Sequence, residues 1–111
     1  MNIQELVEES NAIAKAKGWW KPAKTFGELI ALIHSEASEA LEFYRERLEP
    51  TEIVFTGDEG KKPDGIPIEL ADIVIWVAAL CGYYGIDLEA ALRMKLDYNK
   101  TRPYRHGDKK L

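Results

Sequence analysis

The sequence predicts an all-α, single-domain protein built from four helices. Apolar residues recur at helical spacing in four segments, and glycine, proline or capping residues separate these segments. The chain has 111 residues, 46% of them hydrophobic, which suits one domain with its own core. A domain this small buries only a modest fraction of its surface, so association with further copies would help it.

The first two helices are expected over residues 3–17 and 26–48. Gly18 ends the first, and the segment "GWWKPAKT" connects it to the second. The main apolar stripe of the second helix consists of Phe26, Leu29, Ile30, Ile33, Ala37, Ala40, Leu41, Tyr44 and Leu48.

A long loop is expected over residues 49–66, because this segment is rich in glycine, proline and charged residues. The stretch "TEIVF" within it has strand character, but no partner strand is evident. Loops of this length in compact domains are often functional.

The third and fourth helices are expected over residues 67–84 and 88–101. Pro67 occupies a favoured first-turn position, Gly85 can provide a left-handed cap, and Asp87 can cap the fourth helix. Pro103 ends the fourth helix and leaves a tail over residues 103–111. The third helix is apolar on nearly every side, which predicts burial all round, partly against a second copy.

Charge and composition exclude several classes of protein. The net charge of −4 argues against a nucleic acid polymer as partner. The single cysteine, Cys81, excludes an internal disulfide bond, and the amphipathic, acidic N-terminus does not resemble a signal peptide. The longest apolar run, "IVIWVAALCGYY", is too short to span a membrane. We therefore expect a soluble cytoplasmic protein with no membrane partner.

Two pairs of carboxylates interrupt apolar helices. Glu36 and Glu39 lie one turn apart on the second helix, and Glu69 and Asp72 on the third, so each pair begins about 5–6 Å apart. If the pairs converge, their charges raise one another's pKa, and a hard cation such as Mg²⁺ would relieve the repulsion. The ordinary alternatives are a favourable helix-dipole position for Glu69 and simple surface exposure for the glutamates of the second helix.

The fourth helix carries a stripe that begins apolar and becomes cationic: Leu88, Leu92, Lys95, Asn99 and Arg102. A short turn predicts that the third and fourth helices are antiparallel neighbours, with Asn99 level with Asp72 and Arg102 level with Glu69. Lys95, Asn99 and Arg102 would then form a phosphate clamp beside the carboxylates. The alternative is an ion-pair patch at a helix C-terminus.

Three segments together resemble the MazG-type all-α nucleoside triphosphate pyrophosphohydrolases: "SEASEALEFYRE", "IELADIVIWVAAL" and "KLDYNKTRP". The resemblance implies a four-helix MazG-like protomer that assembles into a dimer or tetramer. It implies Mg²⁺-dependent hydrolysis, with Mn²⁺ as a substitute, of (deoxy)nucleoside triphosphates to monophosphate and pyrophosphate in nucleotide-pool housecleaning. It implies metal ligation by Glu36, Glu39, Glu69 and Asp72, and phosphate contacts from Lys95, Asn99 and Arg102. Ser35 departs from the family, in which many members have glutamate at this position.

The catalytic residues and the substrate stay open between alternatives. Either Glu36 or Glu39 can position or deprotonate the attacking water. By resemblance, Trp20 and Asn11 would line a base pocket. A phosphoribosyl-ATP pyrophosphohydrolase would use the same scaffold, and a non-enzymatic helical interaction module would need no metal at all.

Overall fold

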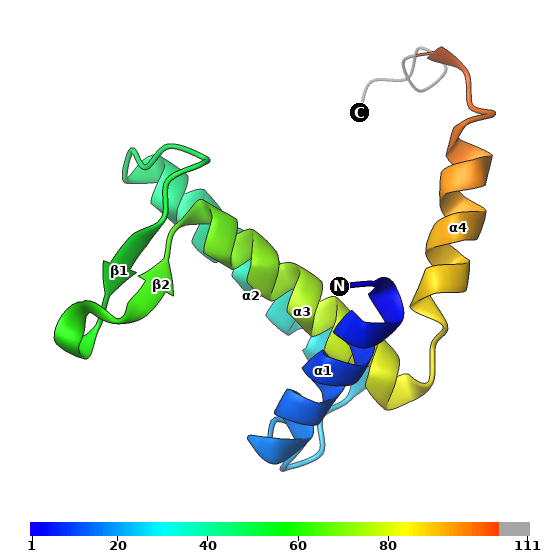
Figure 1. The fold of residues 1–111 in the computed structure, drawn as a ribbon, viewed down its shortest axis with the longest axis horizontal. Helices are drawn as coiled ribbons and strands as arrows, with labels where there is room; N and C mark the ends of the chain where they lie inside the picture. The colour runs from blue at the N-terminus through cyan, green and yellow to red at the C-terminus, as the bar shows by residue number, and fades with distance from the viewer. Residues whose placement is uncertain (105–111) are drawn as a thin grey trace.

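The computed structural model describes residues 1–104, and its four α-helices confirm the predicted all-α class (Figure 1). The tail predicted over residues 103–111 falls outside the described residues from residue 105 onward. The elements in chain order are α1 (Ile3–Ala16), α2 (Phe26–Arg45), β1 (Val54–Thr56), the short 3₁₀ turn η1 (Asp58–Gly60), β2 (Lys62–Asp64), α3 (Ile66–Tyr84) and α4 (Leu88–Asn99).

Local capping explains where the helices begin and end. At the start of α2, the Thr25 hydroxyl accepts from the Glu28 N–H at 3.1 Å and the Glu28 carboxylate accepts from the Thr25 N–H at 3.2 Å, a reciprocal capping box. Gly85 ends α3 at φ +70°, and the Asp87 carboxylate accepts from the Ala90 N–H at 3.0 Å. Both predicted caps are confirmed, while α2 and α4 end two to three residues earlier than the sequence suggested.

Helix α3 is the central element of the fold. It runs antiparallel to α2, and α1 packs against the same helix (Figure 1). The small residues Ala78 and Ala79 of α3 are fully buried, as are Ala14 of α1 and Leu29 of α2. The small side chains of the three alanines let α1 and α3 approach closely, and the core lies along the second half of α3.

The first half of α3 is less covered than its composition predicts. Leu70 and Val74 are each 51% exposed, so the expectation of burial on every side is not met within one protomer. The helix is also longer than the apolar run that suggested it. It has 19 residues and contains a stretch with a mean hydropathy of 1.7, so it is long and apolar enough to cross a membrane by length and composition alone. One such helix is weak evidence for a membrane span, because core helices of soluble proteins share these properties.

A β-hairpin replaces part of the loop predicted over residues 49–66. Strand β1 pairs antiparallel with β2, with Val54 opposite Asp64, Phe55 opposite Pro63 and Thr56 opposite Lys62. The prediction that the first strand lacks a partner is therefore wrong. The sequence gives no sign of the partner strand β2, because lysine, proline and aspartate have low strand propensity. Proline is tolerated in β2 because both strands of the hairpin are edge strands.

The predicted packing of α4 along α3 is wrong within the single chain. After the Gly85 turn, α4 leads away from the other helices and touches α1 instead (Figure 1). The left-handed conformation at Gly85 redirects the chain, and α1 and α2 already pack on α3. No residue of α4 is buried in the described structure. The helix therefore extends from the other helices as an arm.

Candidate metal centre

The packing of α2 against α3 brings three of the four predicted metal ligands together. One carboxylate oxygen from each of Glu36, Glu69 and Asp72 lies within 4.8 Å of the others. Each pair occupies one helical turn, and the two helices are antiparallel neighbours, so the pairs meet at the same level. The predicted convergence of the carboxylates is thus present in the protomer, whereas the ion itself remains a prediction.

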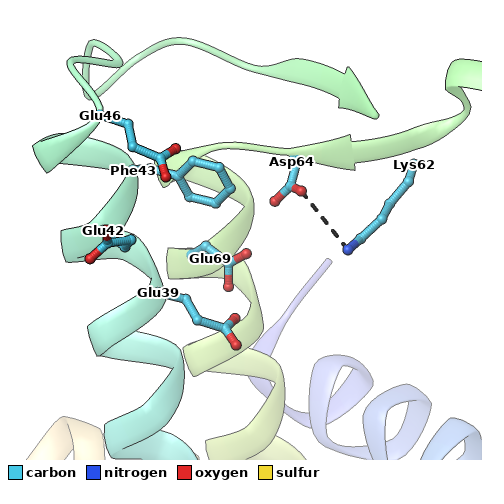
Figure 2. Close-up of a pocket in the computed structure, with 7 residues that line it drawn as sticks. All are labelled: Glu39, Glu42, Phe43, Glu46, Lys62, Asp64 and Glu69. Atoms are coloured by element: carbon cyan, nitrogen blue, oxygen red, sulfur yellow. Dashed lines mark ion pairs between the residues drawn. The ribbon is translucent and has the colours of Figure 1, made fainter. Parts of the chain in front are cut away.

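The fourth predicted ligand, Glu39, lies at the edge of this cluster. Its side chain is exposed, and its carboxylate extends to the same side as that of Glu69 (Figure 2). Both side chains line a cleft of about 260 Å³ between α2, α3 and the hairpin. The lining residues are Glu39, Glu42, Phe43, Glu46, Lys62, Asp64 and Glu69.

Glu69 is the most informative member of the group. It is only 6% exposed, and its Oε2 atom is enclosed with no hydrogen-bond partner among the described residues. A buried carboxylate without a partner is unfavourable, and buried polar groups in folded proteins are nearly always satisfied. A divalent cation would satisfy this atom, because oxygen donors are the ligands that Mg²⁺ and Ca²⁺ prefer. The donor set therefore fits a hard cation.

Burial and mutual repulsion perturb the titration of the whole cluster. Burial, followed by the neighbouring carboxyls of Glu39 and Glu36, raises the pKa of Glu69 from 4.5 to about 8. Burial is also the first cause of the raised pKa of Glu36 and of Asp72. The positive charge of Lys62 opposes the rise in the pKa of Asp72 without cancelling it. Without a cation, the site therefore favours partly protonated carboxyls.

The hairpin contributes two site residues that the sequence analysis missed, Lys62 and Asp64. The Asp64 carboxylate accepts hydrogen bonds from the Thr56 hydroxyl at 3.3 Å and from the Gly65 N–H at 3.1 Å. The Lys62 ammonium lies 3.9 Å from the same carboxylate (Figure 2). The available signal was their i, i+2 spacing directly before α3, which would have placed both on one side of a strand had the strand been recognised.

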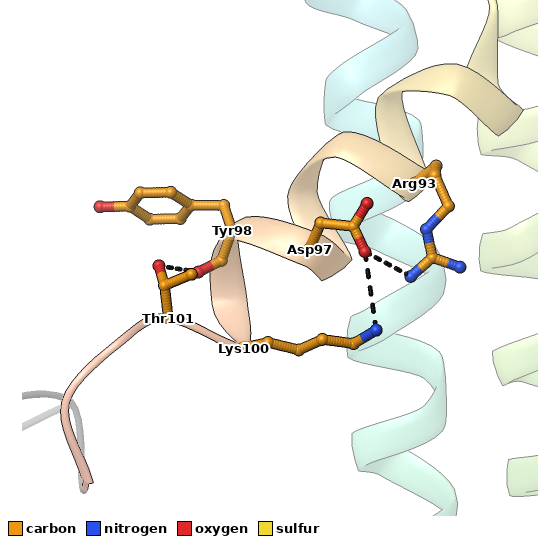
Figure 3. A network of polar contacts seen from close by, with 5 residues as sticks. All are labelled: Arg93, Asp97, Tyr98, Lys100 and Thr101. Carbon is orange, nitrogen blue, oxygen red and sulfur yellow. Dashed lines mark hydrogen bonds and ion pairs between the residues drawn. The ribbon is translucent and has the colours of Figure 1, made fainter.

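The predicted phosphate-binding residues are not beside the carboxylates in the protomer. Lys95 and Asn99 belong to α4, and Arg102 follows it, so all three lie on the arm. The Lys95 ammonium lies 5.1 Å from the centre of the Tyr98 ring. In the surrounding network the Asp97 carboxylate binds Arg93 at 3.0 Å and Lys100 at 3.6 Å (Figure 3).

The predicted base-pocket residues, Trp20 and Asn11, lie at the opposite end of α3 from the carboxylates. The Trp20 ring stacks on Tyr83 at 4.5 Å between centroids. Asn11 packs so closely on Gly82 that a Cβ there would lie 2.8 Å from the Asn11 Cβ. Gly82 is ten residues beyond Asp72, which corresponds to about 15 Å along the helix axis. One protomer thus does not combine these two residues with the acidic cluster.

The Asn11 and Trp20 side chains nevertheless share a property with Glu69. Asn11 Oδ1 and Trp20 Nε1 are enclosed without a hydrogen-bond partner among the described residues.

Chemically, the acidic cluster can hold a hard cation, and its cleft leaves one side open to an anionic ligand of that cation. No family model, no curated protein and no solved structure matches the chain.

Proposed function

We propose that this protein is a divalent-cation-dependent nucleoside triphosphate pyrophosphohydrolase of the MazG-like type, with Mg²⁺ as its cation. The observation that carries the proposal is the buried Oε2 atom of Glu69, which has no hydrogen-bond partner among the described residues and lies in the group with Glu36 and Asp72. An ordinary surface patch of acids would leave each carboxylate in water. The open acidic cleft next to the cluster gives the phosphate chain of a substrate a place to approach.

In this proposal the residues divide the work of hydrolysis. Glu36, Glu69 and Asp72 would hold the cation, which would supply neutralisation of phosphate charge and activation of water. Glu39 is exposed at the rim and outside the three-carboxylate group, so it is the better placed of the two candidate bases. The water oxygen forms a bond to the α-phosphorus while its proton passes to Glu39. The bond from the α-phosphorus to the bridging oxygen breaks, and its electron pair leaves with pyrophosphate.

The proposal includes a homo-oligomer, a dimer or a tetramer. Four large apolar residues of α4 are exposed within the protomer: Leu92, Met94, Leu96 and Tyr98. Met94 alone is 74% exposed, and large apolar side chains exposed together on one helix are typical of an interface. The half-exposed Leu70 and Val74 of α3 offer an apolar surface on the other side of such a contact. A second copy whose α4 covers this surface would bring Lys95, Asn99 and Arg102 toward the carboxylates.

A product assay on the full chain tests this function. The purified protein is incubated with Mg²⁺ and each common ribonucleoside and deoxyribonucleoside triphosphate, and with phosphoribosyl-ATP, while pyrophosphate release is measured. We expect release from at least one nucleoside triphosphate, and none in excess EDTA. Turnover of phosphoribosyl-ATP alone would favour the alternative enzyme. An oligomer that binds no Mg²⁺ and releases no pyrophosphate from any substrate would favour the interaction module.

A further inference from the structure

Gly65 joins the hairpin directly to α3 at the mouth of the acidic cleft. This residue has φ +112°, and a Cβ at its position would lie 2.6 Å from the carbonyl oxygen of Glu52, so only glycine fits. The Gly65 carbonyl also accepts from the N–H groups of Ile68 and Glu69, at 3.1 and 3.0 Å. The end of β2 and the first turn of α3 therefore form one unit, and the hairpin has a defined position relative to Glu69.

Within the hairpin, Lys62 and Asp64 share one side of β2 because they are two residues apart. Both line the cleft, and both side chains face it in Figure 2. Asp64 is held in place by two hydrogen bonds, and its side chain is 13% exposed. Lys62 is 70% exposed, and its ion pair to Asp64 is long at 3.9 Å. The Asp64 carboxylate is therefore held in place by hydrogen bonds, whereas the Lys62 ammonium is exposed and only loosely paired with it.

The charge of the cleft gives this lysine a specific role. Five of the seven lining residues carry a carboxylate, and Lys62 is the one cation among these seven. The two charges of a bound cation do not balance five carboxylates, so a polyphosphate that enters the cleft meets net repulsion. The cationic residues of α4 lie on the arm and not in the lining of this cleft. Among the residues that line the cleft, Lys62 is the group that can offset the repulsion.

We propose that Lys62 is a phosphate-binding residue, and that the hairpin carrying it sets how the phosphate chain of the substrate lies over the acidic cluster. The inference rests on the proposed function and adds a residue to it. An exposed ion pair such as Lys62–Asp64 contributes little to stability, so the ammonium can exchange the carboxylate for a phosphate oxygen at small cost. Hydrogen bonds between two charged groups are the stronger kind, which favours this exchange.

The contact is to phosphate and not to the base or sugar, so inorganic tripolyphosphate is the appropriate probe. Its binding to the full-length protein in the presence of Mg²⁺ is measured by calorimetry for the wild type, Lys62→Ala and Lys62→Arg. We expect Lys62→Ala to weaken binding about tenfold, the scale of one charged hydrogen bond. Lys62→Arg should retain most of the affinity, because arginine also binds phosphate.

The neighbouring Lys61 provides a matched control. It belongs to the same hairpin and has the same charge, but it pairs with Glu59 at 3.0 Å and does not line the cleft. Lys61→Ala should bind tripolyphosphate as the wild type does. If Lys61→Ala and Lys62→Ala lose the same amount of affinity for tripolyphosphate, the loss reflects only the change in net charge, and the proposal is overturned. Wild-type affinity in Lys62→Ala would overturn it as well.

The Mg²⁺-induced increase in melting temperature separates this inference from the proposed function. Lys62 is not in the carboxylate group, and its positive charge acts on Asp72 against a bound cation, so Lys62→Ala should show an increase at least as large as that of the wild type. If the wild type responds to Mg²⁺ and binds tripolyphosphate, and Lys62→Ala does both equally well, only the role of Lys62 is wrong. If the wild type shows neither response, the proposed function fails and the role of Lys62 fails with it.

Discussion

Replacement of Glu69 by glutamine should stabilise the cation-free protein while it removes the response to Mg²⁺. The amide has nearly the shape of the carboxylate but cannot ionise. In the wild type, the pKa of Glu69 is raised from 4.5 to about 8, so the folded state binds the proton more tightly than the unfolded state. The stability that this proton provides is fully present below pH 4.5 and is lost as the pH rises through 8.

The size of the effect follows from the same two values. At about 1.4 kcal/mol per pH unit, the interval between 4.5 and 8 corresponds to at most about 5 kcal/mol lost by the wild type. The glutamine amide brings a buried donor that lacks a partner, which costs about 1–3 kcal/mol. In EDTA at pH 8, Glu69→Gln should therefore exceed the wild type in free energy of unfolding by about 2 kcal/mol. At pH 5 the advantage should disappear.

Urea unfolding at fixed protein concentration, at pH 5 and pH 8, with EDTA or with Mg²⁺, measures these differences. Glu42→Gln is the matched control, because Glu42 also lines the cleft but is exposed and pairs with Arg45 at 3.3 Å. The control should change the free energy of unfolding by less than about 0.5 kcal/mol. The reasoning is refuted if Glu69→Gln is less stable than the wild type in EDTA at pH 8, or if it keeps the wild-type response to Mg²⁺.

Three further outcomes are expected. Millimolar Mg²⁺ should raise the melting temperature of the wild type and raise that of Asp72→Asn much less, because a ligand that binds only the folded state stabilises that state. Equal melting temperatures of the wild type in Mg²⁺ and in EDTA would contradict the metal site. Hydrolysis in ¹⁸O-water should label the monophosphate and not pyrophosphate, and Glu39→Gln should reduce turnover by about 10²–10⁴-fold without loss of helicity; label in pyrophosphate would refute attack at the α-phosphorus. Sedimentation at low micromolar concentration should show an oligomer that Met94→Glu dissociates, whereas a wild-type monomer would contradict the role given to α4.

The sequence predicted the features that depend on residues close together in the chain. Gly85 and Asp87 act as caps through their own local conformation and side chain, so both could be identified without the fold. The approach of Glu36 to Glu69 and Asp72 could also be predicted, because periodic helices joined in sequence pack with their apolar faces together. These features needed only helical spacing and one pairing of neighbouring helices.

The features that depend on chain direction or distant pairing could not be predicted. Lys62 and Asp64 join the cleft only because their strand pairs with residues 54–56, and "KPD" has no strand propensity of its own. Lys95 was expected beside the carboxylates because residues were counted in both directions from the turn between the third and fourth helices. That count assumes the fourth helix folds back along the third, whereas the conformation at Gly85 sends it elsewhere. A count of residues fixes the level on a helix but not the direction in which the next helix leaves.

The attachment of the hairpin to α3 at Gly65 has a consequence for how this protein can evolve. The base of the hairpin is anchored to α3, whereas its tip, formed by residues 57–61, is exposed and makes no contact that holds the carboxylates in place. Insertions or charge changes at the tip can therefore accumulate without disturbing the helices that carry Glu36, Glu69 and Asp72. Descendants of this chain can acquire a new preference for what enters the cleft while the acidic cluster is inherited unchanged, because variable loops on a rigid scaffold evolve independently of it.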